Sequence, residues 1–220
     1  MSRIKHLLFD CDGVLVDTEY TAAVKMSEAL QKLGIDISVD YYLKTFSGTT
    51  FSSIVKNYFA NTINESEVIA LVNKVEEQVT AEVKLIHGVE PMLASIDVAK
   101  SVVSNSSMRT VTQVITATSI QRYFAAEIFS SELVDDPKPA PDVYNLAIDT
   151  LGYATTELLV VEDSLSGATA ALAAGLEVIG FVGGSHILPG HGQQLLNLGV
   201  KQLADNMADL ASILKLKLKE

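Results

Sequence analysis

The second half of the chain alternates short apolar runs with helix-like segments, and this alternation restricts the fold more than any other feature. The apolar runs are "SVVS", "EIFS", "LLVV" and "EVIGFV", and helices are expected between them around 108–118, 140–151 and 166–174. Apolar runs of this length are typical of buried strands. Strands that alternate with helices build right-handed βαβ units, which place helices on both faces of a parallel sheet.

The first part of the chain has a different pattern. The run "IKHLLF" at 4–9 predicts a buried strand, because it is too short for a helix and acids follow it. Apolar residues then recur at helical spacing over 18–33, and Gly34 is well placed to end that helix. A second long helix is expected over 64–85, with shorter helices on either side of "SGTT" within 38–60.

These patterns together predict an α/β protein with a doubly wound, parallel-sheet core that is interrupted after its first strand. We expect residues 1–14 and 88–220 to form the core domain, and residues 15–87 to form an all-helical inserted domain. The chain has 220 residues, of which 48% are apolar and 20% charged, so it is long enough to bury a substantial core.

Charge and composition exclude several classes of function. The formal net charge is −11, and no basic stripe of the kind that nucleic-acid binding needs is visible. No apolar run reaches the roughly 18 residues of a membrane span, and the N-terminal residues do not resemble a signal peptide. The single cysteine, Cys11, excludes an intrachain disulfide, and we expect a small buried side chain there. We therefore expect a cytoplasmic monomer or weak homodimer, with neither nucleic acid nor a membrane as a partner.

Polar residues follow three of the predicted strands at the point where each strand ends. In doubly wound sheets, ligands bind beyond the carboxyl ends of the strands, where the strand order reverses. We therefore expect these side chains to meet in one crevice. They are Asp10 and Asp12 after the first strand, Ser104 and Asn105 after "SVVS", and Glu162 and Asp163 after "LLVV".

Asp10 and Asp12 are two positions apart, so both side chains point to the same side of an extended segment. Together with Asp163 they would form a set of hard oxygen ligands suited to Mg²⁺. The pair alone is weak evidence, because acids at strand ends often lie in solvated turns. Carboxylates this close disfavour each other's ionised form, and a bound cation would make the cluster tolerable.

Four motifs, in their order along the chain, resemble the signature motifs of the haloacid dehalogenase-like hydrolase superfamily, which has a Rossmann-like core. They are "FDCDGVLVDTE", "VVSNSS", "DPKPAPDVY" and "VVEDSLSG". The helical insertion after the first motif is similar to the cap of the subgroup that contains β-phosphoglucomutase and small sugar-phosphate phosphatases. The resemblance covers essentially the whole chain. It implies that 15–87 form a cap domain, a lid with hinges near Val14–Val16 and Ile86–Gly88 that excludes water.

The resemblance also implies a role for each motif residue. Asp10 would be the nucleophile that forms an aspartyl-phosphate, and Asp12 would act first as general acid and then as general base. Ser104 and Asn105 would bind the phosphoryl oxygens, and Lys138 would neutralise the charge of the nucleophile and the phosphate. Taken alone, Ser104 and Asn105 would be ordinary turn residues and Lys138 a solvated loop lysine.

A bound Mg²⁺ ion is the cofactor that the resemblance implies. It would be held by the carboxylates of Asp10 and Asp163 and by the main-chain oxygen of Asp12, while Glu162 would support the water shell of the metal. Taken alone, Asp163 could be only the N-cap of the helix that follows.

The activity implied is Mg²⁺-dependent hydrolysis of a small phosphorylated metabolite, a sugar or sugar-acid phosphate, as in the 6-phosphogluconate phosphatase type. Gly48, Thr49 and Phe51 of the cap loop would contribute to substrate choice. Phosphomutase relatives carry an arginine at the position of Phe51, and a lysine and an asparagine at those of Ser107 and Met108. A second phosphate would therefore be held weakly, which favours a phosphatase over a β-phosphoglucomutase-like mutase.

One alternative belongs to a different class of protein. A phospho-accepting signalling receiver also carries an acid pair, a Ser or Thr, and a Lys on a parallel α/β sheet. It is close to half as long as this chain and has no helical lid, and Asp12 as a general acid suits turnover better than signalling.

Two further features are weighed from the residues alone. His186 and His191 lie in "GGSHILPGHGQ", where no third metal ligand is matched, so a surface loop is expected rather than a second metal site. Gly13 is interpreted as a backbone requirement, because the chain must turn sharply after the first strand and glycine permits unusual dihedral angles.

Overall fold

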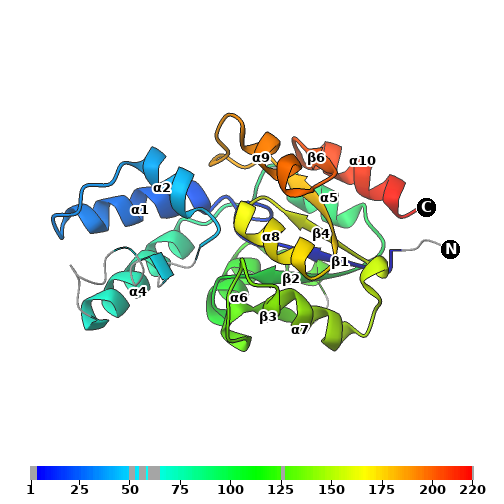
Figure 1. Ribbon diagram of the computed structural model, residues 1–220, viewed down its shortest axis with the longest axis horizontal. Helices are drawn as coiled ribbons and strands as arrows, with labels where there is room; N and C mark the ends of the chain where they lie inside the picture. The colour runs from blue at the N-terminus through cyan, green and yellow to red at the C-terminus, as the bar shows by residue number, and fades with distance from the viewer. Residues whose placement is uncertain (1–3, 50–52, 55–57, 59–64, 125–126, 220) are drawn as a thin grey trace.

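The computed structural model describes residues 4–49, 53–54, 58, 65–124 and 127–219. These residues form a parallel sheet of six strands in the order β3-β2-β1-β4-β5-β6 (Figure 1). The strands are β1 (His6–Phe9), β2 (Ala99–Ser104), β3 (Ile128–Ser130), β4 (Leu158–Glu162), β5 (Glu177–Phe181) and β6 (Gln202–Ala204).

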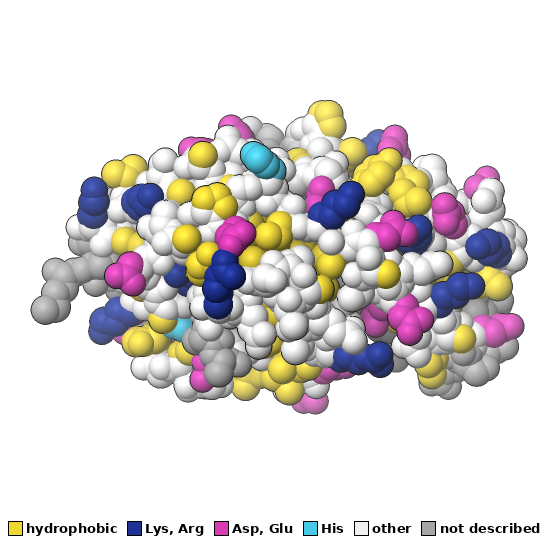
Figure 2. Space-filling view, turned by 180° about the vertical axis from the view of Figure 1, so that it is seen from behind, with side chains coloured by type: hydrophobic (Ala, Val, Ile, Leu, Met, Phe, Trp, Pro, Cys, Tyr) yellow, Lys and Arg dark blue, Asp and Glu magenta, His cyan; other side chains and the backbone are white. Residues whose placement is uncertain are grey.

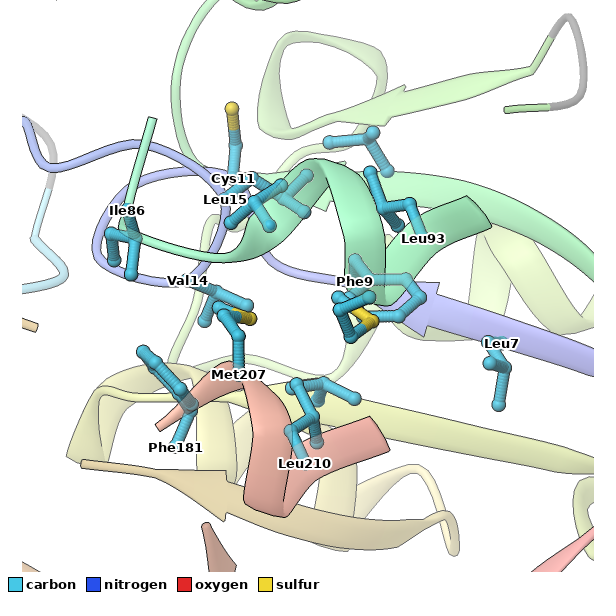
Figure 3. Close-up of a cluster of buried hydrophobic side chains, with 14 of the residues drawn as sticks. Leu7, Phe9, Cys11, Val14, Leu15, Ile86, Leu93, Phe181, Met207 and Leu210 are labelled. Atoms are coloured by element: carbon cyan, nitrogen blue, oxygen red, sulfur yellow. The ribbon is translucent and has the colours of Figure 1, made fainter. Parts of the chain in front are cut away.

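Two layers of helices enclose the sheet, because successive side chains of each strand point to opposite faces. Leu7 and Phe9 of β1 belong to one apolar cluster, and Leu8 between them belongs to another. In Figure 3, Phe9 lies between Leu93 and Leu210, which come from helices on the first face. That face is covered by α5 (Val89–Ala94), α6 (Met108–Ala117) and α10 (Met207–Lys217), and the other by α7 (Asp142–Leu151), α8 (Leu165–Ala173) and α9 (His191–Leu198).

The helices of the insertion lie beside the sheet rather than on either face of it (Figure 1). Those with described bounds are α1 (Glu19–Gln31), α2 (Val39–Phe46) and α4 (Glu65–Ala81). Their buried apolar residues, including Met26, Tyr42 and Phe46, form a third cluster of their own. Two chain segments lead to these helices side by side, since Val16 and Leu85 form an antiparallel bridge and the Ile86 amide donates to the Leu15 carbonyl at 3.1 Å.

The structure confirms the α/β doubly wound fold expected from the alternating pattern. The five predicted strands are present, but β6 was missed because "QLA" is too short to stand out as an apolar run. The start expected at 64 for the second long helix lies outside the described residues, and α4 ends at Ala81. Gly34 follows α1 with a φ of 79°, in the left-handed region where glycine is favoured.

Two observations bear on the surface. Among the described residues, no helix combines the length and the apolar character that crossing a bilayer requires. On the face shown in Figure 2, the Lys and Arg side chains are interspersed with Asp and Glu side chains.

Candidate active site

The strand order reverses around β1, and the carboxyl ends of β1, β2 and β4 meet at one edge of the sheet. A cavity of about 210 Å³ opens there, between this edge and the helices of the insertion. Sequence reasoning expected a crevice at this position. The cavity is lined by Asp10, Asp12, Ser104, Asn105, Lys138 and Asp163, and by Thr18, Glu19, Tyr42, Gly48, Thr49 and Glu76 from the insertion.

A buried lysine organises the floor of the cavity. Lys138 is only 3% exposed, and its Nζ lies 2.6 Å from Asp10 Oδ1 and 2.9 Å from Glu162 Oε2. Nζ also donates to the carbonyl oxygen of Val103 at 2.9 Å. The lysine therefore satisfies all three of its hydrogens within the protein, as a buried charge must.

The electrostatics of the floor follow from burial and close charges. Burial raises the pKa of Asp10 well above its usual value. The neighbouring Glu162 carboxylate raises this pKa further, and Lys138 lowers it only in part. The pKa of Asp163 is also raised by burial and by Glu162. The pKa of Glu162 is lowered despite its burial, since Lys138 and Ser164 stabilise its ionised form. Removing water disfavours charge unless a partner compensates for it.

The same residues fit a divalent cation. Carboxylate oxygens of Asp10, Glu162 and Asp163 all lie within 4.8 Å of one another. When all three are ionised, they carry two more negative charges than the Lys138 ammonium group compensates, a state that the raised pKa values of Asp10 and Asp163 disfavour unless a cation is bound. Asp163 Oδ1 is buried and has no hydrogen-bond partner among the described residues. Hard oxygen donors with an excess charge of −2 match the requirements of Mg²⁺.

Asp12 is held differently from Asp10, by hydroxyl groups instead of a cation. Thr18 Oγ1 donates to Asp12 Oδ1 at 2.5 Å, and Ser106 Oγ donates to Asp12 Oδ2 at 2.8 Å. Ser104 Oγ lies farther from Asp12 Oδ2, at 3.5 Å, and accepts a hydrogen bond from the Ser106 amide. The Asp12 carboxylate lines the cavity, so a bound molecule can reach it.

Asn105 connects the floor of the cavity to the insertion. Its Oδ1 accepts from the Lys138 amide at 2.9 Å, and its Nδ2 donates to the carbonyl oxygens of Lys138 and Gly48, both at 3.1 Å. The sequence predicts that Asn105 binds phosphate, whereas here its side-chain amide is occupied by these main-chain groups. In this structure the residue fixes the loop that carries Lys138.

These observations can be set beside known proteins. The profile of the haloacid dehalogenase-like hydrolase family matches residues 7–181. The chain belongs to this family. Its 6-phosphogluconate phosphatase relative from Escherichia coli is 26% identical over 198 residues, which cover 86% of this chain and 87% of the relative. A fructose-1-phosphate phosphatase from the same organism is 27% identical over 184 residues, with 80% and 96% covered.

A solved structure is similar over nearly the whole length. The haloacid dehalogenase-like protein of unknown function from Agrobacterium tumefaciens has a TM-score of 0.83 and 32% identity, and 97% of this chain and 98% of that chain are covered. The family match and the two named phosphatases support a phosphoric monoester hydrolase.

The insertion contributes the opposite wall of the cavity in this hydrolase. Gly48 has a φ of 74°, and a Cβ there would lie 2.5 Å from Cβ of Ser164, so the loop of the insertion that contains Gly48 packs tightly against the start of α8. Glu19 and Glu76 bring carboxyl groups to this wall. Burial raises the pKa of Glu19 to about 7. Gly48 and Thr49 line the cavity as the sequence predicts, whereas Phe51 lies outside the described residues.

The expectation of a surface loop is wrong for His186, although Gly183, Ser185, Pro189 and Gly190 of the same segment are exposed. His186 is 4% exposed, and its Nε2 lies 2.8 Å from Asp163 Oδ2. His191 is the first residue of α9, and its Nε2 lies 2.6 Å from the carbonyl oxygen of Asp163. Their spacing and glycine-rich setting suggested solvent exposure, but tertiary contacts bury His186 against the end of β4.

Sequence reasoning missed several other residues of the site. The Ser106 and Thr18 hydroxyls donate to the Asp12 carboxylate. Both residues lie inside the motifs quoted above, so their hydroxyl groups could have been predicted to bind an acid of the site. Glu162 was expected to support the water shell of a metal. Its oxygens accept from Lys138, Ser164 and the Tyr144 hydroxyl, the last at 3.0 Å, and its role toward a metal stays a prediction. No local pattern predicts the pairing of Glu162 with Tyr144. Asp163 does not cap the helix that follows, since Ser164 is the N-cap of α8.

Proposed function

We propose that this hydrolase is a Mg²⁺-dependent phosphatase that acts on a small phosphorylated metabolite, a sugar or sugar-acid phosphate, through an aspartyl-phosphate on Asp10. The observation that carries the proposal is the buried ion-pair centre of Lys138, Asp10 and Glu162 at the floor of a cavity that Asp12 also lines. Phosphoryl transfer depends mainly on positioning and charge neutralisation, and this centre supplies both.

In the proposed first step, an Asp10 carboxylate oxygen forms a bond to phosphorus while the bond from phosphorus to the ester oxygen breaks. Lys138, 2.6 Å from Asp10 Oδ1, holds that carboxylate in one orientation and offsets the charge of the incoming phosphate. Asp10 and Asp163 would hold Mg²⁺, with the main-chain oxygen of Asp12. When bound, this ion would neutralise charge on the carboxylates and on the phosphoryl oxygens.

Asp12 would give its proton to the leaving ester oxygen, and then remove a proton from the water that hydrolyses the aspartyl-phosphate. The Thr18 and Ser106 hydroxyls, 2.5 and 2.8 Å from its two oxygens, fix the carboxyl group beside the cavity. The Ser104 hydroxyl and main-chain N–H groups of the loop that Asn105 fixes are proposed to bind the phosphoryl oxygens. Lys138, whose three hydrogens are already used, would act on the phosphate through its positive charge.

The charges of the cavity favour a substrate with one phosphate. Among the described residues that line it, only Lys138 is positively charged at neutral pH, and Lys138 is already bound to two carboxylates. Glu19, Glu76 and Glu132 also line the cavity, and they would repel a second phosphate. This supports a phosphatase over a phosphomutase, and neutral sugar phosphates over sugar-acid phosphates.

We propose that residues 15–87 act as a cap and that 1–14 and 88–220 form the core. The separate apolar cluster of the inserted helices supports this division, because each part has buried residues of its own. The paired segments at Val16 and Leu85 would be the hinge, and Gly48 and Thr49 would contact the part of the substrate beyond its phosphate.

The test is phosphate release from a panel of sugar phosphates, sugar-acid phosphates and nucleotides, measured with Mg²⁺ and again with excess EDTA. We expect multiple turnovers with Mg²⁺ only, and none in Asp10→Asn, because a neutral amide is a poor nucleophile. Undiminished hydrolysis by Asp10→Asn would overturn the mechanism. Conversion of β-glucose 1-phosphate to the 6-phosphate with a bisphosphate primer would identify a mutase. A single stoichiometric phosphorylation without turnover would indicate a signalling receiver.

A further inference from the structure

The loop between β5 and α9 brings two histidines to the back of Asp163, and the proposed mechanism uses neither of them. His186 Nε2 lies 2.8 Å from Asp163 Oδ2, and His191 Nε2 lies 2.6 Å from the carbonyl oxygen of the same residue. The side chain and the main chain of Asp163 are therefore each held by one imidazole ring.

The partners decide which ring nitrogens carry hydrogen. A carbonyl oxygen can only accept, so His191 Nε2 is the donor to Asp163. In the ionised state that binds a cation, the Asp163 carboxylate likewise only accepts, so in that state His186 Nε2 donates to Oδ2. This leaves Asp163 Oδ1, which is buried and has no hydrogen-bond partner among the described residues, as the oxygen free to bind a cation.

Tight packing prevents the pair from rotating. A Cβ at Gly13 would lie 2.1 Å from Asp163 Oδ2 and 2.8 Å from His186 Cε1, and a Cβ at Gly184 would lie 2.6 Å from the same ring carbon. The backbone thus closes on the contact from two sides. Gly13 has a φ of 82°, which agrees with the backbone requirement expected from the sequence.

The loop is also fixed at points away from Asp163. Ser185 donates to Asp17 Oδ1 from its hydroxyl at 2.7 Å and from its amide at 3.3 Å. Leu188 packs against the apolar cluster of the inserted helices. Because these contacts anchor the loop, they also fix the position of His186 relative to Asp163.

We propose that His186, supported by His191, is a positioning residue that orients the Asp163 carboxylate for the divalent cation. The proposal rests on the metal site of the proposed function and adds to it a residue outside the four motifs. A hydrogen bond to one oxygen of a metal-binding carboxylate fixes the direction of the other. Loss of such outer partners weakens metal affinity by about 10- to 100-fold.

The test compares two substitutions at His186 that are similar in length but differ in hydrogen bonding. In His186→Gln the amide nitrogen can take the position of Nε2, whereas His186→Met fills similar space and donates nothing. Binding of Mn²⁺ alone to the full chain is measured by electron paramagnetic resonance of the free ion. We expect His186→Met to raise the Kd for Mn²⁺ by about 10- to 100-fold, and His186→Gln to restore most of that loss.

Activity provides a second readout. At saturating Mg²⁺, His186→Met should keep kcat within a few-fold of the original enzyme while needing more Mg²⁺ for half-maximal rate. If His186→Met does not fold, His186→Asn, which is polar but too short to reach Oδ2, replaces it in the comparison with His186→Gln. His191→Met should raise the Kd less, because it contacts the main chain and not the carboxylate.

The outcomes separate this proposal from the proposed function. Equal Mn²⁺ affinity in the original enzyme and in the non-donating variant would overturn the role of His186, while Mg²⁺-dependent phosphate release would leave the phosphatase intact. Absence of Mn²⁺ binding in the original enzyme, together with EDTA-resistant hydrolysis, would overturn the metal site itself.

Discussion

The cavity has two walls that differ in how their charges are compensated. The core wall is the edge of the sheet, and the cap wall is formed by the inserted helices and the Gly48 loop. On the core wall, Asp10, Lys138, Glu162 and Asp163 are at most 7% exposed, and Lys138 compensates two of the carboxylates directly. On the cap wall, Glu19 and Glu76 bring carboxyl groups to the cavity without a lysine or arginine among its described lining residues.

The difference separates two tasks. A buried charge with close partners, such as Lys138 between Asp10 and Glu162, stays in one place, and this is what a nucleophile and a phosphate need. Carboxyl groups on a wall without cations do not hold a phosphate, but they can accept hydrogen bonds from hydroxyl groups and repel anions. The core wall therefore suits the chemistry that is common to all substrates, and the cap wall suits the choice among them.

The largest effect is expected from removing the cation of the core wall, which tests whether charge compensation distinguishes this wall from the cap wall. Lys138→Met leaves Asp10 and Glu162 buried without their partner, so we expect activity near background and a loss of about 3–5 kcal/mol in the free energy of unfolding, measured with urea in the presence of EDTA. Lys100→Met is the matched control. Lys100 is also buried, but it donates to the Ile96 and Val98 carbonyls and to no carboxylate of the described residues. If both variants lose equal stability and activity, Lys138 has no special role.

A smaller effect is expected at Asp12, which stands between the two walls. Asp12→Ala removes the proposed general acid and should lower kcat by on the order of 10²–10⁴, with little change in urea stability because only hydroxyl contacts are lost. Substrates with a good leaving group, such as p-nitrophenyl phosphate, need less protonation and should lose less. An equal loss for both kinds of ester would contradict the assignment of Asp12 as the acid.

On the cap wall, Glu19→Gln should change stability rather than chemistry, with an effect that grows between pH 4.5 and 7 and is complete above pH 7. The pKa of Glu19 is about 7 in the folded protein against 4.5 in the unfolded chain, so the folded form holds a proton that the unfolded form has lost. The stability that this proton provides is complete below pH 4.5 and is lost as the pH rises through 7.

The variant carries a neutral amide at every pH and avoids this loss. Relative to the original protein, Glu19→Gln should therefore be on the order of 1–3 kcal/mol more stable at pH 8 and nearly unchanged at pH 4.5, in urea unfolding without metal. Glu28→Gln is the control, since Glu28 is exposed on the same helix. A difference that does not depend on pH would contradict the burial of a charged Glu19.

The smallest effect concerns substrate charge. Glu76→Gln removes one negative charge from the cap wall, so kcat/KM for sugar-acid phosphates should rise a few-fold relative to that for neutral sugar phosphates. Glu77→Gln, at an exposed position on the same helix, should leave the ratio unchanged. A fall in the ratio would mean that Glu76 assists the binding of acids instead of opposing it.

Much of the core wall could be predicted because strand ends are recognisable. A buried run followed by polar residues marks the carboxyl end of a parallel strand, and parallel pairing brings Asp10, Ser104 and Asp163 to one edge. The cap wall could be predicted only in outline. Helical spacing predicted α1 and α4, but not which of their acids face the cavity, because this depends on how the helices sit against the core.

The residues missed share one physical property, which is that their partners are far away in the chain. His186 was assigned to a surface loop because its neighbours in sequence are Gly, Ser and Pro, while the contact that buries it is to Asp163. Glu162 was expected in the crevice, but its partners Lys138 and Tyr144, 24 and 18 positions away, were not predicted. Periodicity and turn chemistry describe local preferences and contain no information on such pairs.

The sequence by itself determined the alternating α/β core, the helical interruption after the first strand, and the family to which the motifs belong. Each depends on apolar periodicity or on short motifs, which act over a few residues. Only the tertiary structure decided that Asn105 binds the main chain at Lys138 and Gly48, and that two histidines hold Asp163. These contacts form when the sheet and the cap loop pack together, because buried polar groups then take whichever donor or acceptor the packing leaves within reach.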